Sequence, residues 1–360
     1  MVRPNLTPLV LAMTALNPVN AAPAPEIPPA ATAAWVESLG VAAAPLRSAI
    51  PAAERALEVI RLAAVPSAGD APSGWARGAT LARYAAAETA DPRRLESTRD
   101  YARRTLAGKP ADRITVDDLI ARLRADAALI TTACDEAARN ATGAGIPVVI
   151  ADLRVIARLA EFHGLRLKAA VHYNLFLRAQ RLAELVAATY VEKEAVNVWR
   201  GLVAATVAAA RHGTRARPLH LRSDWAADLA RLEESARDLE AQCCPPAPEL
   251  LRERTWEPAA PKSLDAPRVE ILRTAGRGER VLLRLSTPAR FTRVFLLTRA
   301  PGESVFRETP AAVTAEGDWE AELPSSAGRL EGYVASQGPE GTHFFPAPWD
   351  RPSLLAISGR

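Results

Sequence analysis

The sequence predicts a chain with two kinds of domain, an all-α part followed by a β part. Three observations indicate this. A long region rich in Ala, Leu and Arg carries apolar residues at helical spacing. Prolines then concentrate between residues 243 and 266, and beyond them apolar residues alternate with a period of two. We therefore expect a helical domain at 31–242, divisible into 31–112 and 113–242, a proline-rich linker at 243–266 and a β domain at 267–360.

Composition is typical of a globular protein and excludes several classes. The 360 residues are 49% hydrophobic, enough for two or three cores. The net charge is +4, but basic residues are interspersed with acids, as at Glu192, Lys193 and Glu194. We therefore expect no nucleic-acid partner. No apolar run reaches the roughly 18 residues of a membrane span, so we also expect no membrane-spanning segment.

Motifs for metals and cofactors are missing from the sequence. The three cysteines, Cys134, Cys243 and Cys244, lack the C-x-x-C spacing of a zinc site. Gly108 and Lys109 lack the upstream glycine of a phosphate-binding loop and are followed by proline. We predict no metal and no cofactor.

Residues 1–30 allow two interpretations. Arg3 precedes an apolar stretch, and small residues follow at 19–21, as in a signal peptide. Pro4 and Pro8 interrupt that pattern, so the segment can equally be the tail of a longer reading frame. The sequence leaves open whether the protein is exported to the periplasm or the exterior.

The helical part should be a bundle or a short α-solenoid of helices with short connections. Pro51 and Pro66 are expected to separate helices, and the acids Asp117 and Asp118 mark the first turn of another. The helices are expected at 35–39, 52–64, 75–88, 93–106, 115–139, 148–179, 182–211 and 224–242.

The helix at 148–179 carries the most informative side chains. Arg166 lies in the middle of an apolar stripe, so it needs a buried partner, and Asp135 and Glu136 are both candidates. We interpret His163, Arg166 and Tyr173 as a buried polar cluster. His163 and His172 are nine residues apart, about 180° around one helix, and cannot hold one metal ion together. We therefore predict no catalytic residue here.

The C-terminal part should hold about seven short strands in the manner of an immunoglobulin or fibronectin type III sandwich. Strands are expected at 269–271, 281–285, 291–297, 319–323, 330–336, 343–345 and 354–357, with another around Val305. Exposed tryptophans can stack on sugar rings, which makes Trp319 and Trp349 candidates for ligand binding. Trp319 alternates with Ala321 and Leu323, so a place in the core is the competing interpretation.

Three stretches carry a resemblance to known proteins: ARLAEFHGLRLKAAVHYNLFLRA at 157–179, EKEAVNVWRGLV at 192–203, and LEGYVASQGPEGTHFFPAPW at 330–349. Together with RPLHLRSDW at 217–225 they resemble a helical accessory module and C-terminal sandwich of large bacterial carbohydrate-active, glycosidase-like proteins. The resemblance covers roughly 113–360 and brings no catalytic motif with it.

Three functions are compatible with this sequence. The first is a non-catalytic accessory, binding or interaction protein, or the C-terminal part of a larger polysaccharide-processing protein, with polysaccharide or another protein domain as partner. The second is a polysaccharide lyase or hydrolase that joins a helical toroid to a β-sandwich. It requires His172 and Asn174 to meet Tyr101 or Tyr190 across a groove. The third is a cytoplasmic helical scaffold.

Overall fold

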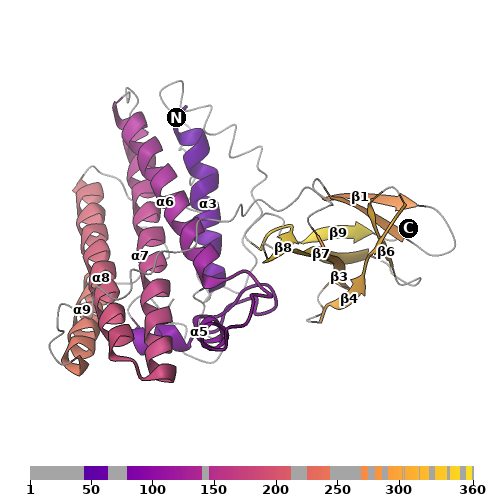
Figure 1. The fold of residues 1–360 in the computed structure, drawn as a ribbon. Helices are drawn as coiled ribbons and strands as arrows, with labels where there is room; N and C mark the ends of the chain where they lie inside the picture. The colour runs from indigo at the N-terminus through magenta and orange to yellow at the C-terminus, as the bar shows by residue number, and fades with distance from the viewer. Residues whose placement is uncertain are drawn as a thin grey trace. The chain divides into compact units, whose positions relative to one another are not determined.

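A computed structural model of the chain describes residues 44–63, 79–139, 146–211, 225–243, 269–274, 280–285, 291–301, 303, 305–315, 317–323, 329–338, 341–348 and 354–358. Among these residues helices come first and antiparallel strands follow (Figure 1). Contacts divide the chain into two compact units: Met1–Pro92, Ser97–Gly108 and Leu119–Pro258 form the first; Arg93–Glu96, Lys109–Asp118 and Ala259–Arg360 form the second. The helix expected at 35–39 and most of the expected linker lie outside the described residues.

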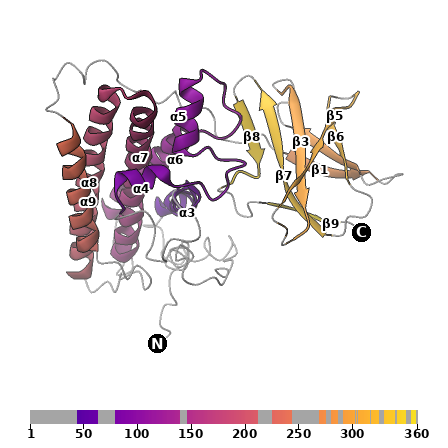
Figure 2. The same cartoon turned by 90° about the horizontal axis from the view of Figure 1, so that it is seen from below.

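The helical unit is organised around α7, Ile146–Ala179. α7 packs against α8, Leu182–Arg211, and α8 packs against α9, Trp225–Gln242. Three earlier helices also pack against α7: α3 (Leu46–Ala63), α4 (Leu81–Ala86) and α5 (Thr98–Leu106). Figures 1 and 2 show α7 between α8 on one side and α3 on the other. This position explains why α7 has apolar residues on more than one face.

Pro51 does not separate two helices, contrary to the expectation. It lies inside α3, which begins five residues earlier at Leu46. Proline removes the hydrogen bond to the carbonyl of Arg47, but both residues are exposed, so water can take its place. The opposite faces of α3 bury Ala53, Leu57 and Ile60, which offsets the loss.

Two other helices, unlike α3, are shorter than expected. Of the range 75–88, only Leu81–Ala86 is helical among the described residues, and Thr80 caps it. The helix expected from residue 93 begins at Thr98, because the side chain of Ser97 accepts a hydrogen bond from the backbone of Asp100. Residues before Ser97 form a parallel bridge instead, between Leu95 and Ile114.

The next helix, α6, covers Val116–Arg139 and starts with a reciprocal cap. The backbone and hydroxyl of Thr115 donate to the carboxylate of Asp118, and the backbone of Asp118 donates to the hydroxyl of Thr115. No helix in the described part of the chain combines the length and the apolar character needed to cross a membrane.

The C-terminal strands form two antiparallel sheets, with orders β1-β2-β6-β5 and β4-β3-β7-β8, and β9 also pairs with β7. The strand expected around Val305 corresponds to β4, which begins two residues later at Arg307, and Val305 itself is 64% exposed. The strands of the two sheets have these bounds: Val269–Thr274 (β1), Arg280–Leu285 (β2), Arg293–Arg299 (β3), Arg307–Pro310 (β4), Ala312–Val313 (β5), Trp319–Glu322 (β6), Arg329–Gly338 (β7), Gly341–Phe345 (β8) and Leu355–Ser358 (β9).

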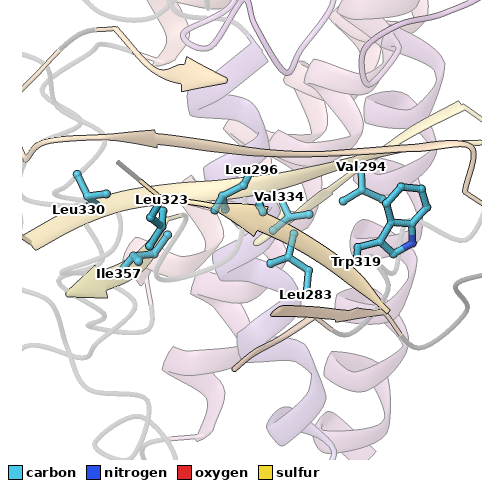
Figure 3. Close-up of a cluster of buried hydrophobic side chains, with 9 residues drawn as sticks. Leu283, Val294, Leu296, Trp319, Leu323, Leu330, Val334 and Ile357 are labelled. Atoms are coloured by element: carbon cyan, nitrogen blue, oxygen red, sulfur yellow. The ribbon is translucent and has the colours of Figure 1, made fainter. Parts of the chain in front are cut away.

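One apolar core joins the two sheets. Leu283 and Trp319 come from the first sheet, and Val294, Leu296 and Val334 come from the second. Figure 3 shows these side chains gathered between the strands. In β7, Gly332 is required by close packing, since a Cβ there would lie 2.3 Å from the carbonyl oxygen of Leu297.

Candidate functional site

The polar side chains of α7 were expected to form a buried cluster, and Arg166 is at the centre of one group. Its Nε lies 3.2 Å from Oε2 of Glu192 on α8, and both side chains are 0% exposed. Its Nη2 donates to the carbonyl of Ala79 at 3.0 Å. The expected partners were wrong: Asp135 instead pairs with Arg154 at the surface. The ion pair therefore joins α7 to α8 rather than to α6.

Two aromatic side chains enclose the guanidinium of Arg166. Its Cζ lies 4.6 Å from the centre of the Tyr84 ring and 5.6 Å from that of Phe162. Tyr84 also hydrogen-bonds through its hydroxyl to Nδ1 of His163 at 3.1 Å. We call Tyr84, His163, Arg166 and Glu192 the Arg166 cluster. It joins α4, α7 and α8.

Burial sets the electrostatics of this cluster. Removal from water raises the pKa of the Glu192 carboxyl group, and the charge of Arg166 offsets that rise in part. Burial likewise raises the pKa of Tyr84, which stays a neutral phenol over the physiological range. The tyrosine is therefore a hydrogen-bonding group here and not a base.

A second buried group lies nearer the C-terminal end of α7. Nδ1 of His172 is 2.8 Å from Oε2 of Glu184 on α8, with side-chain exposures of 5% and 6%. A histidine held by a carboxylate is a common arrangement in general-base catalysis. Such catalysis also requires a substrate to reach the imidazole, and this one is buried.

Asn174 belongs to a third buried contact. Its Nδ2 donates to the carbonyl of Ala85 at 3.0 Å and contacts the hydroxyl of Thr98 at 3.1 Å. That hydroxyl donates to the same carbonyl at 3.1 Å. Asn174 therefore holds the C-terminal end of α4 beside the start of α5.

The tyrosines that a lyase would require do not join these groups in any contact described for this chain. Tyr101 is buried beneath the guanidinium of Arg104, whose Cζ lies 5.0 Å from its ring centre. Tyr190 is 55% exposed. Tyr173, which we grouped with His163 and Arg166, is half-buried, whereas its neighbours His172 and Asn174 are buried.

Of the two tryptophans considered for ligand binding, only Trp319 lies among the described residues. Trp319 is 6% exposed and belongs to the core of the strand unit, so its ring faces are covered by apolar side chains. This burial agrees with the competing interpretation that Trp319 packs in the core. Trp349 lies outside the described residues.

Sequence reasoning missed Glu192 and Tyr84. The signal for Glu192 was present, because it shares a helical stripe with Ala188, Ala195 and Trp199, all of which are fully buried. An acid on such a stripe needs a partner, as Arg166 does. Tyr84 had no comparable signal, since a six-residue helix presents too few positions to define a stripe.

The structure offers few other reactive groups. The described residues contain no group of three or more His, Cys, Asp or Glu side chains placed to hold a metal ion. Cys134 is buried, and burial raises the pKa of its thiol to about 12. Cys243, at the end of α9, contacts the hydroxyl of Thr189 at 3.2 Å.

Comparisons with known proteins give a likeness to solved structures. Neither a family model nor a curated protein matches the chain. One solved structure similar to it is a GH138 enzyme targeting pectin rhamnogalacturonan II, with a TM-score of 0.47 and 13% sequence identity. The match covers 58% of this chain and 34% of that one. The chain thus spans about a third of that enzyme's length.

Proposed function

We propose that this chain is a non-catalytic accessory or binding unit of polysaccharide processing. One observation carries the non-catalytic part: His163, His172 and Asn174 are each at most 5% exposed and bonded to groups of neighbouring helices. Side chains used in this way hold helices together and are closed to a polymer substrate. The polysaccharide part rests on the sequence resemblance of 157–179, 192–203 and 330–349.

We further propose that the strand unit is a sandwich of the immunoglobulin or fibronectin type III kind. The order β1-β2-β6-β5 corresponds to strands A, B, E and D of that fold, and β4-β3-β7-β8 corresponds to C′, C, F and G. An experimental structure with the same strand order would support this assignment. A structure with a strand exchanged between the sheets would overturn it.

Binding to soluble polysaccharides tests the proposed role. The chain is run in affinity gels containing one polysaccharide each, including pectic, hemicellulosic and bacterial polymers, and any retardation is measured. We expect retardation by at least one polymer, and loss of it in Trp349→Ala. Tyr190→Ala, which removes an exposed aromatic from α8, is the matched control and should bind as the unmodified chain does.

Assays of cleavage on the same polymers distinguish the alternatives. New reducing ends would report hydrolysis, and absorbance from new unsaturated uronates would report a lyase. Cleavage that disappears in His172→Ala and Asn174→Ala would replace the accessory role with an enzyme. Neither binding nor cleavage with any polymer would remove the polysaccharide part of the proposal and favour a protein partner.

A further inference from the structure

The sheet β4-β3-β7-β8 is buried on both faces, although the apolar core lies on only one of them. Leu296 and Val334 belong to that core, so the residues beside them in sequence, Leu297 and Tyr333, lie on the opposite, outer face. Leu297 is nevertheless 8% exposed and Tyr333 only 2% exposed. An antiparallel sheet of this kind commonly presents one face to water. A part of the molecule other than the first sheet therefore covers the outer face.

Aromatic side chains make this outer face apolar. The ring of Tyr333 on β7 makes edge contacts with the rings of Phe306 and Phe344, with ring centres 5.0 and 5.9 Å apart. Phe344 on β8 is 6% exposed. Together with Leu297 these rings would form a contiguous apolar patch if water reached them. The strand unit is therefore complete only with a cover on this face.

The cover comes from Arg93–Glu96, a segment far away in sequence that belongs to the strand unit by its contacts. The guanidinium of Arg94 lies 4.6 Å from the centre of the Tyr333 ring, and Arg94 is 5% exposed. Arg93 donates to the carbonyl of Phe306 at 3.4 Å and lies over the ring of the same residue at 6.0 Å. A contact between a guanidinium and an aromatic ring is strongest where water is excluded, as it is at Tyr333.

A second segment, Lys109–Asp118, holds the first one in place. The backbone of Glu96 donates to the carbonyl of Ile114 at 2.9 Å, and the backbone of Ile114 donates to the carbonyl of Arg94 at 2.9 Å. These bonds form the parallel bridge between Leu95 and Ile114, which are 0% and 7% exposed. We call these two segments together the clasp.

We infer that the clasp is an integral part of the strand unit and that the strands are stable only while it is docked. The outer sheet face is then an interaction surface whose partner is a segment of the same chain, and residues 267–360 by themselves are an incomplete domain. The helix α5 lies between the two clasp segments in the chain, so the chain enters and leaves it through the clasp. This inference does not depend on the proposed function.

Hydrogen exchange of the full, unmodified chain at low denaturant concentrations tests the clasp. The opening free energy of each amide and its slope with denaturant identify the residues that open as one cooperative group. We expect the bridge amides of Glu96 and Ile114 to open together with the amides of β3 and β7. Bridge amides that open with those of α7 and α8 would overturn the inference. Bridge amides that open while the strands stay protected would overturn it as well.

Two substitutions, one on each side of the contact, test the coupling in both directions. Arg94→Met removes the cation from Tyr333, and we expect the opening constants of the β3 and β7 amides to rise by about tenfold. Tyr333→Leu changes the same contact from the strand side. It should raise the opening constants of the Glu96 and Ile114 amides, which lie in the clasp.

Arg104→Met is the matched control, because Arg104 makes the same kind of contact within α5, 5.0 Å from the ring centre of Tyr101. It should leave the β3 and β7 amides unchanged. Unchanged strand amides in Arg94→Met would contradict the inference, as would unchanged clasp amides in Tyr333→Leu. An equal rise in Arg104→Met would contradict it too, since the effect would then be general. The denaturant series on the unmodified chain decides the question if a variant does not fold.

Discussion

The long helices and the two sheets bury different kinds of side chain. The interior of the helical unit contains charged and polar side chains that are almost fully buried, among them Asp126, His163, Arg166, His172, Glu184 and Glu192. Between the two sheets lies an apolar cluster with Leu283, Leu296 and Trp319 as members, and the buried polar side chains of the strands, Thr298 and Ser336, carry no charge. The helices and the sheets therefore depend on different interactions for a unique arrangement.

The difference follows from where the backbone hydrogen bonds are made, between strands in a sheet but within each helix. Strands fix their register through hydrogen bonds to neighbouring strands, so a plain apolar core between sheets is sufficient. The backbone hydrogen bonds of a helix form within that helix, so only side chains can fix one helix against another. Helix faces rich in alanine carry small side chains, which interdigitate little with those of a neighbouring helix. We infer that polar contacts such as Arg166–Glu192 supply the missing specificity.

Breaking the central ion pair should have the largest effect. Arg166→Met leaves Glu192 buried without its counter-charge, which should cost about 3–5 kcal/mol in the free energy of unfolding. Urea unfolding followed by the helical circular dichroism signal measures it. The double variant Arg166→Met, Glu192→Leu should recover much of the loss. A double variant as unstable as the single one would show that volume, not charge, matters here.

Removing the largest side chain of the apolar core gives the corresponding test for the strands. Trp319→Ala should cost about 3–5 kcal/mol by leaving a cavity, whereas Trp319→Phe should cost less. The readout is thermal unfolding followed by near-ultraviolet circular dichroism. A small effect of the alanine variant would contradict the core position of this tryptophan.

A single uncharged polar contact should have an intermediate effect. Asn174→Ala leaves the buried carbonyl of Ala85 with one fewer donor and should cost about 1–3 kcal/mol in urea unfolding. Asn197→Ala is the control on α8, since Asn197 is exposed and contacts only Arg200 in the bonds described. Its cost should stay near zero. Equal costs for both variants would argue against a specific role for buried polar contacts.

A surface ion pair should contribute least. Lys193 and Glu240 are 45% and 55% exposed, so Lys193→Met should change stability by about 0–1 kcal/mol. Screening by salt should reduce even that difference. Unfolding at low and high salt measures it. A large effect that salt leaves unchanged would mean that the stem of Lys193 packs against α9.

Periodicity predicted the long elements well and the short ones poorly. The helices at 115–139, 148–179 and 182–211 agree with α6, α7 and α8 within about two residues, because a long amphipathic pattern samples many turns. Pro51 was misread because its local cost is outweighed by burial of the rest of α3. The start of α5 moved to Thr98 because a cap, rather than periodicity, decides where a helix begins.

The candidate site was predictable only in part. The stripe on α7 predicted that Arg166 is buried and requires a counter-charge, and it is buried with one. Identifying the partner required the packing of the helices, since residues far apart in sequence meet only there. The sequence offered Asp135 and Glu136 as candidates without a means of choosing, and the partner is Glu192 of α8.

By itself the sequence determined the order of the chain, helices and then antiparallel strands, because spacing and proline placement are local properties. It also determined that α7 carries polar groups among apolar ones. Tertiary structure alone decided that Glu192 pairs with Arg166, that His172 pairs with Glu184 and that Asn174 holds α4. The reason is physical: a buried polar group is satisfied by whatever partner packing brings within about 3 Å, and local sequence does not encode that partner.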